Sequence, residues 1–225
     1  MRPSIAARGV SAGYHGVPVI RDVDLAVCPG EVVLLAGPNG AGKTTTVMTL
    51  AGALKPLAGR TEIDGEATDL PLFRRVRWGV GVVTEQRSVF ARLTLAENLR
   101  LGRGATALAL RYFPELEKRL RVRAGLLSGG EQQMLSLARV LAAQPAIILA
   151  DEMSLGLAPA VVTRLHGALR SAADAGSAVL LVEQHVRLGL EVADRACFLR
   201  RGRIELRGDA DTIRRDESRI EQIYL

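Results

Sequence analysis

Apolar residues gather along the chain in short continuous runs that alternate with segments of helical periodicity. Four such runs occupy residues 31–37, 79–83, 146–151 and 178–183, with the sequences EVVLLAG, GVGVV, AIILAD and AVLLVE. Continuous apolar strands are typical of a sheet that is covered on both faces. Their alternation with helical segments predicts an α/β fold with a mostly parallel core sheet.

The N-terminal part of the chain follows a different pattern. Residues 23–27, VDLAV, alternate between apolar and polar side chains, and with SIAARGV at 4–10 they predict an antiparallel β subdomain. The dipeptide Asp64-Gly65, inside EIDGEA, adds the signal of a tight hairpin.

Strand patterns are missing between about residues 92 and 127, and we expect an inserted helical subdomain there. LTLAENLRLG at 93–102 and RYFPELEKRLRVRAG at 111–125 are each predicted to be helical, on either side of a Gly-rich break. Thr94, followed three residues later by Glu97, forms a capping box at the start of the first helix.

The C-terminal segment and the length of the chain give the rest of the predicted domain organisation. CFLRRGRIELRGDADTI at 197–213 predicts a two-stranded turn that leads to a short final helix. At 225 residues the chain is expected to form a single domain spanning 1–225.

Composition narrows the classes of partner. No apolar run approaches the ~18 residues of a membrane span, and the N-terminus lacks a signal-peptide pattern, so we expect a soluble cytoplasmic chain. A net charge of +6 leaves nucleic acid and anionic membrane surfaces open. The arginines are spread along the chain and aromatic residues make up only 4%, so we expect no nucleic-acid partner.

Residues 37–45, GPNGAGKTT, follow a predicted strand and open a predicted helix, which is the context of a phosphate-binding loop. The glycines let backbone amides turn toward phosphate oxygens, and the helix N-terminus adds a favourable dipole. Lys43 supplies a charge for the β- and γ-phosphates, and the Thr44 hydroxyl suits Mg²⁺. The expected nucleotide-binding residues of this loop are Gly37, Pro38, Asn39, Gly40, Ala41, Gly42, Lys43, Thr44 and Thr45.

Carboxylates follow at the same predicted sheet edge. The strand 146–151 ends in Asp151-Glu152, and strand C-termini of a parallel sheet converge on the ligand. Asp151 can hold magnesium through water, while Glu152 can orient or deprotonate an attacking water.

Other candidates follow neighbouring strands. Glu85 and Gln86 come after residues 79–83 and can contact the metal or a water. His185 follows the strand 178–183 and can reach a γ-phosphate. Tyr14, in a loop before the first core strand, can stack on an adenine.

A second anion site opens a later helix. Ser128 is a good N-cap, and Gly129-Gly130 leave backbone amides uncovered. The helix then repeats apolar residues at helical spacing and leads into the strand of Asp151. Its start can close the open side of a triphosphate, either within one chain or across two.

The segment LSGGEQQ, residues 127–133, resembles the signature motif of ABC ATPases, and the other motifs stand in that family's order along essentially the whole chain. The resemblance implies a P-loop NTPase of ABC type that uses ATP and Mg²⁺. It further implies these roles: Tyr14 as the A-loop aromatic, 37–45 as Walker A, Glu85 at the Q-loop position with Gln86 one place late, 147–151 as Walker B, Glu152 as the catalytic glutamate and His185 as the switch histidine.

The family also implies partners. Two such domains pack head to tail, so Ser128, Gly129, Gly130 and Gln132 would cap the ATP held by a second ATP-binding subunit, in a homodimer or a heterodimer. The pair would drive integral-membrane permease subunits from the cytoplasmic face of the cell membrane, as a peripheral protein.

Within the family, RSVFARLTLAENL, SLGLAP and the closing IYL are similar to ATP-binding subunits of branched-chain amino acid importers. A urea or short-amide importer ATPase and a soluble non-transport ABC ATPase are the alternatives. Two features depart from the usual pattern. Met153 replaces the usual proline, which predicts a looser turn, and the segment between Leu101 and Arg111 is short.

Overall fold

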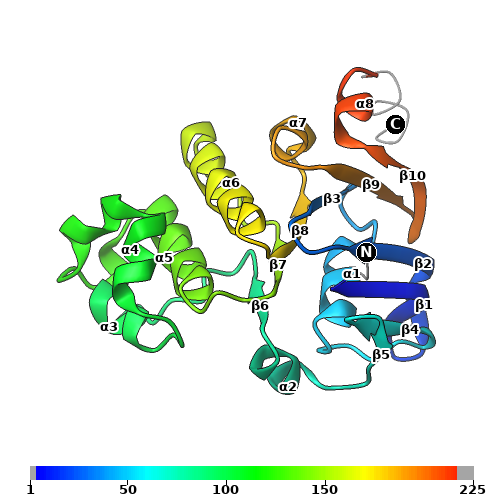
Figure 1. Cartoon of the computed structure of the whole chain (residues 1–225), viewed down its shortest axis with the longest axis horizontal. Helices are drawn as coiled ribbons and strands as arrows, with labels where there is room; N and C mark the ends of the chain where they lie inside the picture. Colours follow the sequence, from blue (N-terminus) through cyan, green and yellow to red (C-terminus); the bar gives the residue numbers. More distant parts are fainter. Residues whose placement is uncertain (1–3, 217–225) are drawn as a thin grey trace.

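The computed structural model describes residues 4–216 and shows a six-stranded core sheet in the order β10-β9-β3-β8-β7-β6 (Figure 1). Neighbouring strands from β9 to β6 are parallel, and β10 is antiparallel to β9. The four apolar runs form β3 (Val32–Ala36), β6 (Val80–Val83), β7 (Ile147–Asp151) and β8 (Ala178–Glu183), as predicted. The other two strands are β9 (Arg195–Arg200) and β10 (Arg203–Asp209).

A second, antiparallel sheet has the order β2-β1-β4-β5. Its strands are β1 (Ile5–Tyr14), β2 (Val17–Val27), β4 (Ala58–Ile63) and β5 (Glu66–Ala67). Asp64 and Gly65 both have positive φ in the β4–β5 turn, as a tight hairpin requires. The predicted N-terminal antiparallel subdomain is therefore confirmed.

Alternate residues of the core strands pack into two separate apolar cores. Leu34, Ile148 and Leu181 join the core that includes helix α6 (Pro159–Asp174). Leu35 and Leu149 join the core that includes helix α1 (Lys43–Leu50) and the antiparallel sheet. The core sheet is thus covered on both faces, which explains why its strands are continuously apolar.

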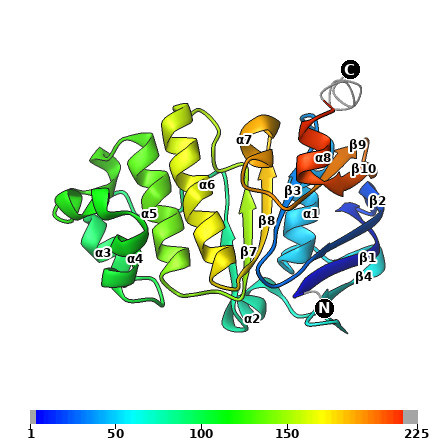
Figure 2. The ribbon, with the colours of Figure 1, turned by 45° about the horizontal axis from the view of Figure 1, so that its top comes forward.

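The helical lobe lies at the end of the molecule farthest from the antiparallel sheet (Figures 1 and 2). It contains α3 (Leu95–Arg100), α4 (Thr106–Tyr112), the 3-10 helices η1 (Pro114–Arg119) and η2 (Ala124–Leu126), and α5 (Gly129–Leu141). Thr94 and Glu97 form the predicted capping box.

The helix predicted over 111–125 is wrong. Helix α4 ends at Tyr112, Phe113 has φ of −135°, and a short 3-10 helix starts at Pro114. Proline has no amide hydrogen and disfavours helical backbone in the residue before it, which accounts for the break.

The remaining helices are α2 (Leu72–Arg77), α7 (Val186–Leu190) and α8 (Ala210–Arg214). Strands β9 and β10 with α8 confirm the turn and final helix predicted for 197–213, whereas the closing IYL lies outside the described residues. Within 4–216, no helix has the length and apolar character needed to cross a membrane.

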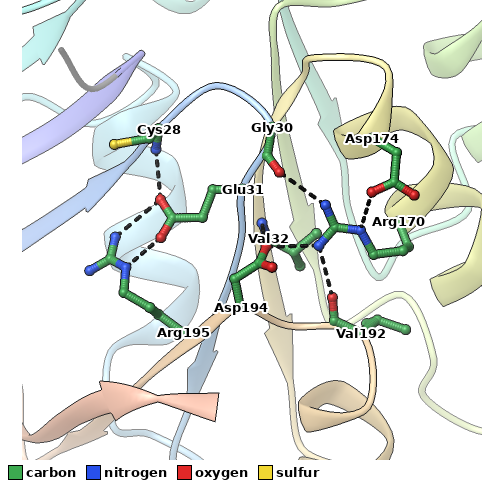
Figure 3. Close-up of polar contacts among 9 residues, drawn as sticks. All are labelled: Cys28, Gly30, Glu31, Val32, Arg170, Asp174, Val192, Asp194 and Arg195. Atoms are coloured by element: carbon green, nitrogen blue, oxygen red, sulfur yellow. Dashed lines mark hydrogen bonds and ion pairs between the residues drawn. The ribbon is translucent and has the colours of Figure 1, made fainter. Parts of the chain in front are cut away.

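Polar contacts join the loops at the edge of the core sheet where β3 and β9 begin (Figure 3). Arg195 pairs with both carboxylate oxygens of Glu31 and donates to the Ala26 carbonyl at 2.8 Å. Glu31 also accepts the Cys28 amide at 2.8 Å. The loop between β2 and β3 is therefore tied to the first residue of β9.

Arg170 of α6 makes the second half of this network. Its guanidinium donates to Asp194 at 2.7 Å, to the Gly30 carbonyl at 2.9 Å and to Asp174 at 2.8 Å. Asp194 also accepts the Val32 amide at 2.8 Å. One carboxylate thus links a helix to the start of the central strand.

We expect Asp194→Ala to lower the free energy of unfolding by about 1–3 kcal/mol, because it leaves the buried Val32 amide and the Arg170 guanidinium without this acceptor. Asp174→Ala is the matched control. It removes an ion pair whose aspartate side chain is 65% exposed, and we expect a loss below about 1 kcal/mol. Urea unfolding compares the two, and equal losses would contradict the importance assigned to Asp194.

Candidate nucleotide-binding site

The predicted phosphate loop joins β3 to α1 at the carboxyl edge of the core sheet. Gly37 has φ of 154° and Gly42 has φ of 106°. A Cβ on Gly37 would lie 2.1 Å from the Leu199 carbonyl oxygen, and one on Gly42 would lie 2.4 Å from Ile20. Both positions therefore require glycine, for conformation and for space.

Lys43 is buried inside this loop. Its ammonium donates to the Gly37 carbonyl at 2.8 Å and to the Pro38 carbonyl at 3.1 Å. It also lies 3.1 Å from Oε1 of Glu152, in an ion pair whose side chains are 3% and 15% exposed. The structure thus brings together two residues that are 109 positions apart and were both predicted to act on the nucleotide.

Strand alternation directs Asp151 toward α1. Ile147 and Leu149 of β7 belong to the apolar core shared with α1, so Asp151 lies on the same face. Its carboxylate accepts a hydrogen bond from the Thr44 side chain. The other oxygen, Oδ1, is buried without a hydrogen-bond partner among the described residues.

Burial is the main cause that raises the pKa of Asp151 to about 6, and the negative charges of Glu152 and Glu85 raise it further. The Thr44 hydrogen bond and the Lys43 charge act in the opposite direction. A buried carboxylate oxygen that lacks a partner is a site for an added cation or proton.

Glu152 follows Asp151, the last residue of β7, and its backbone no longer has the strand conformation. Its φ is 45°, and its amide donates to the Val182 carbonyl at 3.0 Å. Oε1 pairs with Lys43, and Oε2 accepts the side-chain amide of Gln184 at 2.7 Å. Its carboxylate is therefore held from both sides.

Sequence reasoning missed Gln184. Leu180 and Val182 of β8 belong to the core shared with α1, and continued alternation directs residue 184 to the same side. That alternation was visible in the sequence. His185, which was predicted to reach the γ-phosphate, stands at the N-cap position of α7, where its exposed side chain makes no capping hydrogen bond.

The side chain of Glu85 is exposed, as is that of Gln86, but Glu85 is near enough for its negative charge to contribute to the raised pKa of Asp151. Gln86, the other candidate, is exposed, and its carbonyl accepts the Thr84 and Ser88 hydroxyls. Tyr14 does not lie in a loop as expected. It is the last residue of β1, 50% exposed, because the β1–β2 ribbon extends to the turn after it.

Ser128 caps α5 through a complete capping box. Its hydroxyl accepts the Glu131 amide at 3.3 Å, and its amide donates to the Glu131 carboxylate at 2.8 Å. Gln132 donates to the Ala124 carbonyl at 2.9 Å, and Arg87 lies over Gly129. The predicted second anion site is thus a preformed helix start.

This helix start and the phosphate loop do not meet within one chain. Helices α5 and α1 lie on opposite sides of β7 and β8 (Figure 2), and they belong to different apolar cores. A single triphosphate therefore does not contact both in one copy.

Comparison with known proteins decides the family. The model of the ABC transporter family matches residues 20–154, more than half of the chain. The chain belongs to the ABC transporter family. As an ABC ATPase it binds and hydrolyses ATP, and its two-sheet fold with inserted helices is the fold predicted from the sequence.

Two curated relatives and one solved structure illustrate the similarity. The chain is 41% identical over 205 residues to the high-affinity branched-chain amino acid transport ATP-binding protein BraG of Pseudomonas aeruginosa, covering 87% of this chain and 88% of BraG. It is 34% identical over 239 residues to the lipopolysaccharide export system ATP-binding protein LptB of Escherichia coli K12, covering 99% and 97%. A dimeric ATP-binding cassette solved with ADP and Pi is 26% identical, with a TM-score of 0.79 over 92% of this chain and 98% of that one.

We expect Asp151→Asn to stabilise the nucleotide-free ABC ATPase at pH 8, by on the order of 1–3 kcal/mol, because it removes the cost of burying a charge. Folding raises the pKa of Asp151 from its ordinary value of 3.8 to about 6, so its favourable contribution to stability is complete below pH ~4 and is lost as the pH rises through 6. The advantage of the variant should therefore shrink as the pH falls from 8 to 4.

Chemical unfolding without nucleotide or metal, repeated across this pH range, measures the difference. Asp69→Asn makes the same chemical change at an exposed carboxylate, and it should show no comparable gain. A stability difference for Asp151→Asn that is constant with pH would contradict the assigned cause.

Proposed function

We propose that this ABC ATPase powers an importer of branched-chain or related amino acids. The observation that carries the proposal is the 41% identity to BraG over most of both chains, higher than the 34% identity to LptB. Because LptB serves lipopolysaccharide export and is covered almost completely, export is the second candidate. A urea or short-amide importer remains the alternative within the import class.

Residues of the loop from Gly37 to Thr45 bind the phosphates in this proposal. The amides of a glycine-rich loop and a helix N-terminus favour anions, and the buried Lys43 supplies the positive charge. Phosphate oxygens take the place of the Gly37 and Pro38 carbonyls as acceptors of the Lys43 ammonium.

Thr44 and Asp151 hold Mg²⁺, with Glu85 nearby. The unpartnered, buried Oδ1 of Asp151 fits a cation. Mg²⁺ usually binds one or two carboxylates together with substrate phosphates, which agrees with the finding that residues 4–216 contain no cluster of three or more acidic, His or Cys side chains able to hold a metal alone. When bound, the ion supplies neutralisation of charge on the phosphates.

Glu152 is the general base that orients and deprotonates the attacking water. It lies beside Lys43, so a carboxylate oxygen is close to where the phosphates bind. Its strained backbone, with φ of 45°, directs the side chain away from the strand and toward the nucleotide edge.

Ser128, Gly129, Gly130 and Gln132 cap the ATP of a second subunit. The capped helix start is anion-ready and cannot reach its own chain's loop. The similar cassette solved as a dimer with ADP and Pi supports this arrangement.

A groove of about 480 Å³ between α2 and the helical lobe fits permease contact at the cytoplasmic face of the membrane. Leu101, at its edge, and Trp78, at the end of α2, are 56% and 65% exposed. Residues 94–125 also carry seven basic and only three acidic side chains, which suits an anionic inner leaflet.

We expect Glu152→Gln to bind ATP while hydrolysing it at least ~10²-fold more slowly, because a positioned base is lost. Light scattering with MgATP should show a shift from monomer to dimer for this variant. Adding Ser128→Arg should abolish the shift, because the large side chain blocks the capping site.

Glu66→Gln, at an exposed position of β5, is the matched control for turnover. Normal hydrolysis in Glu152→Gln would remove Glu152 from the role of base. The same mass with and without ATP in both variants would rule out capping across a homodimer and would direct the search to a heterodimer.

We expect deletion of the gene to abolish uptake of labelled leucine, and Trp78→Ser to lower leucine uptake severalfold while basal ATP hydrolysis remains. Trp78 is 65% exposed, stands in sequence between the groove-lining residues Arg77 and Gly79, and belongs to none of the proposed nucleotide-binding segments. Leu57→Ser, at a 49% exposed apolar residue beside the antiparallel sheet, is the control.

The cargo assays distinguish the candidates. Loss of urea uptake alone would favour the amide importer, and loss of lipopolysaccharide from the cell surface with normal uptake of both compounds would favour export. Normal results in all three assays would contradict a transport role with these cargoes.

A further inference from the structure

The carboxylate of Glu152 is held between two donors of different kinds. Lys43 contacts Oε1 at 3.1 Å, and the side-chain amide of Gln184 donates to Oε2 at 2.7 Å. Lys43 is also the residue that the phosphates of ATP attract. When nucleotide enters, the ammonium has a new partner, and Gln184 remains as the donor that fixes the base.

The residue before Gln184 is fixed by buried hydrogen bonds. The preceding residue, Glu183, is completely buried and turned to the other face of the sheet. There its carboxylate accepts the Ser154 hydroxyl and contacts Nε2 of His166 at 3.0 Å. Residue 183 is therefore locked toward α6, and residue 184 is directed toward the nucleotide.

The same group of hydrogen bonds fixes the backbone of Glu152. Ser154, two residues after the base, is bonded to Glu183, the residue before Gln184. The Glu152 amide also donates to the Val182 carbonyl at 3.0 Å. The ends of β7 and β8 are therefore bonded to each other, and the sheet sets the distance between the base and the carboxamide.

His185 is placed differently. It starts α7, its side chain is exposed, and within residues 4–216 it makes no hydrogen bond or ion pair with its imidazole. The glutamine beside it occupies the position from which a side chain reaches the base.

We propose that Gln184 is the positioning residue of the hydrolysis reaction: its amide hydrogen bond to Oε2 orients Glu152 so that the other oxygen faces the attacking water. The inference rests on the proposed role of Glu152 as base. A carboxamide keeps its donor at every pH, so it orients the base without itself titrating.

The test compares Gln184→Ala, Gln184→Glu, Gln184→His and His185→Ala in full-length protein, measuring kcat and ATP affinity separately. We expect Gln184→Ala to lower kcat by roughly 10–100-fold, the scale of losing orientation of a reacting group, while ATP affinity changes less than about twofold. Gln184→Glu, which has the same shape but places a negative charge against Glu152, should be slower still. Gln184→His restores an N–H donor and should recover part of the lost rate.

His185→Ala should lose less than Gln184→Ala. A kcat for Gln184→Ala within about threefold of wild type would overturn the proposal, since that is below the effect of orientation. An equal or larger loss in His185→Ala would also overturn it, as would failure of Gln184→His to recover any rate. Full turnover in Glu152→Gln is a separate result that would disprove the role of the base itself.

Discussion

Parallel pairing of β3, β8 and β7 is the constraint on which the site depends. The register sets Ala36 opposite Glu183 and Asp151 opposite Val182, so the three strands end at one level. The phosphate loop, the Asp151-Glu152 pair and Gln184 each begin within two residues of that level. Hydrogen bonds of the sheet backbone, rather than contacts among the functional side chains, bring these distant parts of the chain together.

The two-sided burial of the sheet adds the second condition. Alternate residues of each strand enter different cores. The position of a residue along its strand therefore decides on which face of the sheet, and against which helix, its side chain packs. Asp151 faces α1 and its Thr44, whereas Glu183 faces α6 and its His166. A shift of one residue in either strand would exchange these environments and disable the site.

Much of this was predictable. The apolar runs correctly predicted β3, β6, β7 and β8. The loop at 37–45 was recognisable as a phosphate-binding loop because its backbone conformation and the space around it admit only glycine at Gly37 and Gly42. The lobe was harder. Pro114 interrupts a segment whose charges and leucines otherwise suit a helix, and tertiary packing decides which structure the chain adopts after such a break. In the site, His185 was chosen for its imidazole, although strand alternation in the sequence already pointed to residue 184. The contact of the buried Glu183 with His166 of α6, which only the structure shows, confirms the face that each residue takes.

The ion pair between Lys43 and Glu152 has a consequence for the energetics of the proposed reaction. In the proposed function the phosphates of ATP compete with the Glu152 carboxylate for the Lys43 ammonium, so part of their binding free energy is used to separate that pair. The same exchange would free Oε1 of Glu152 only when a phosphate occupies the loop, which couples the availability of the proposed base to the presence of the nucleotide.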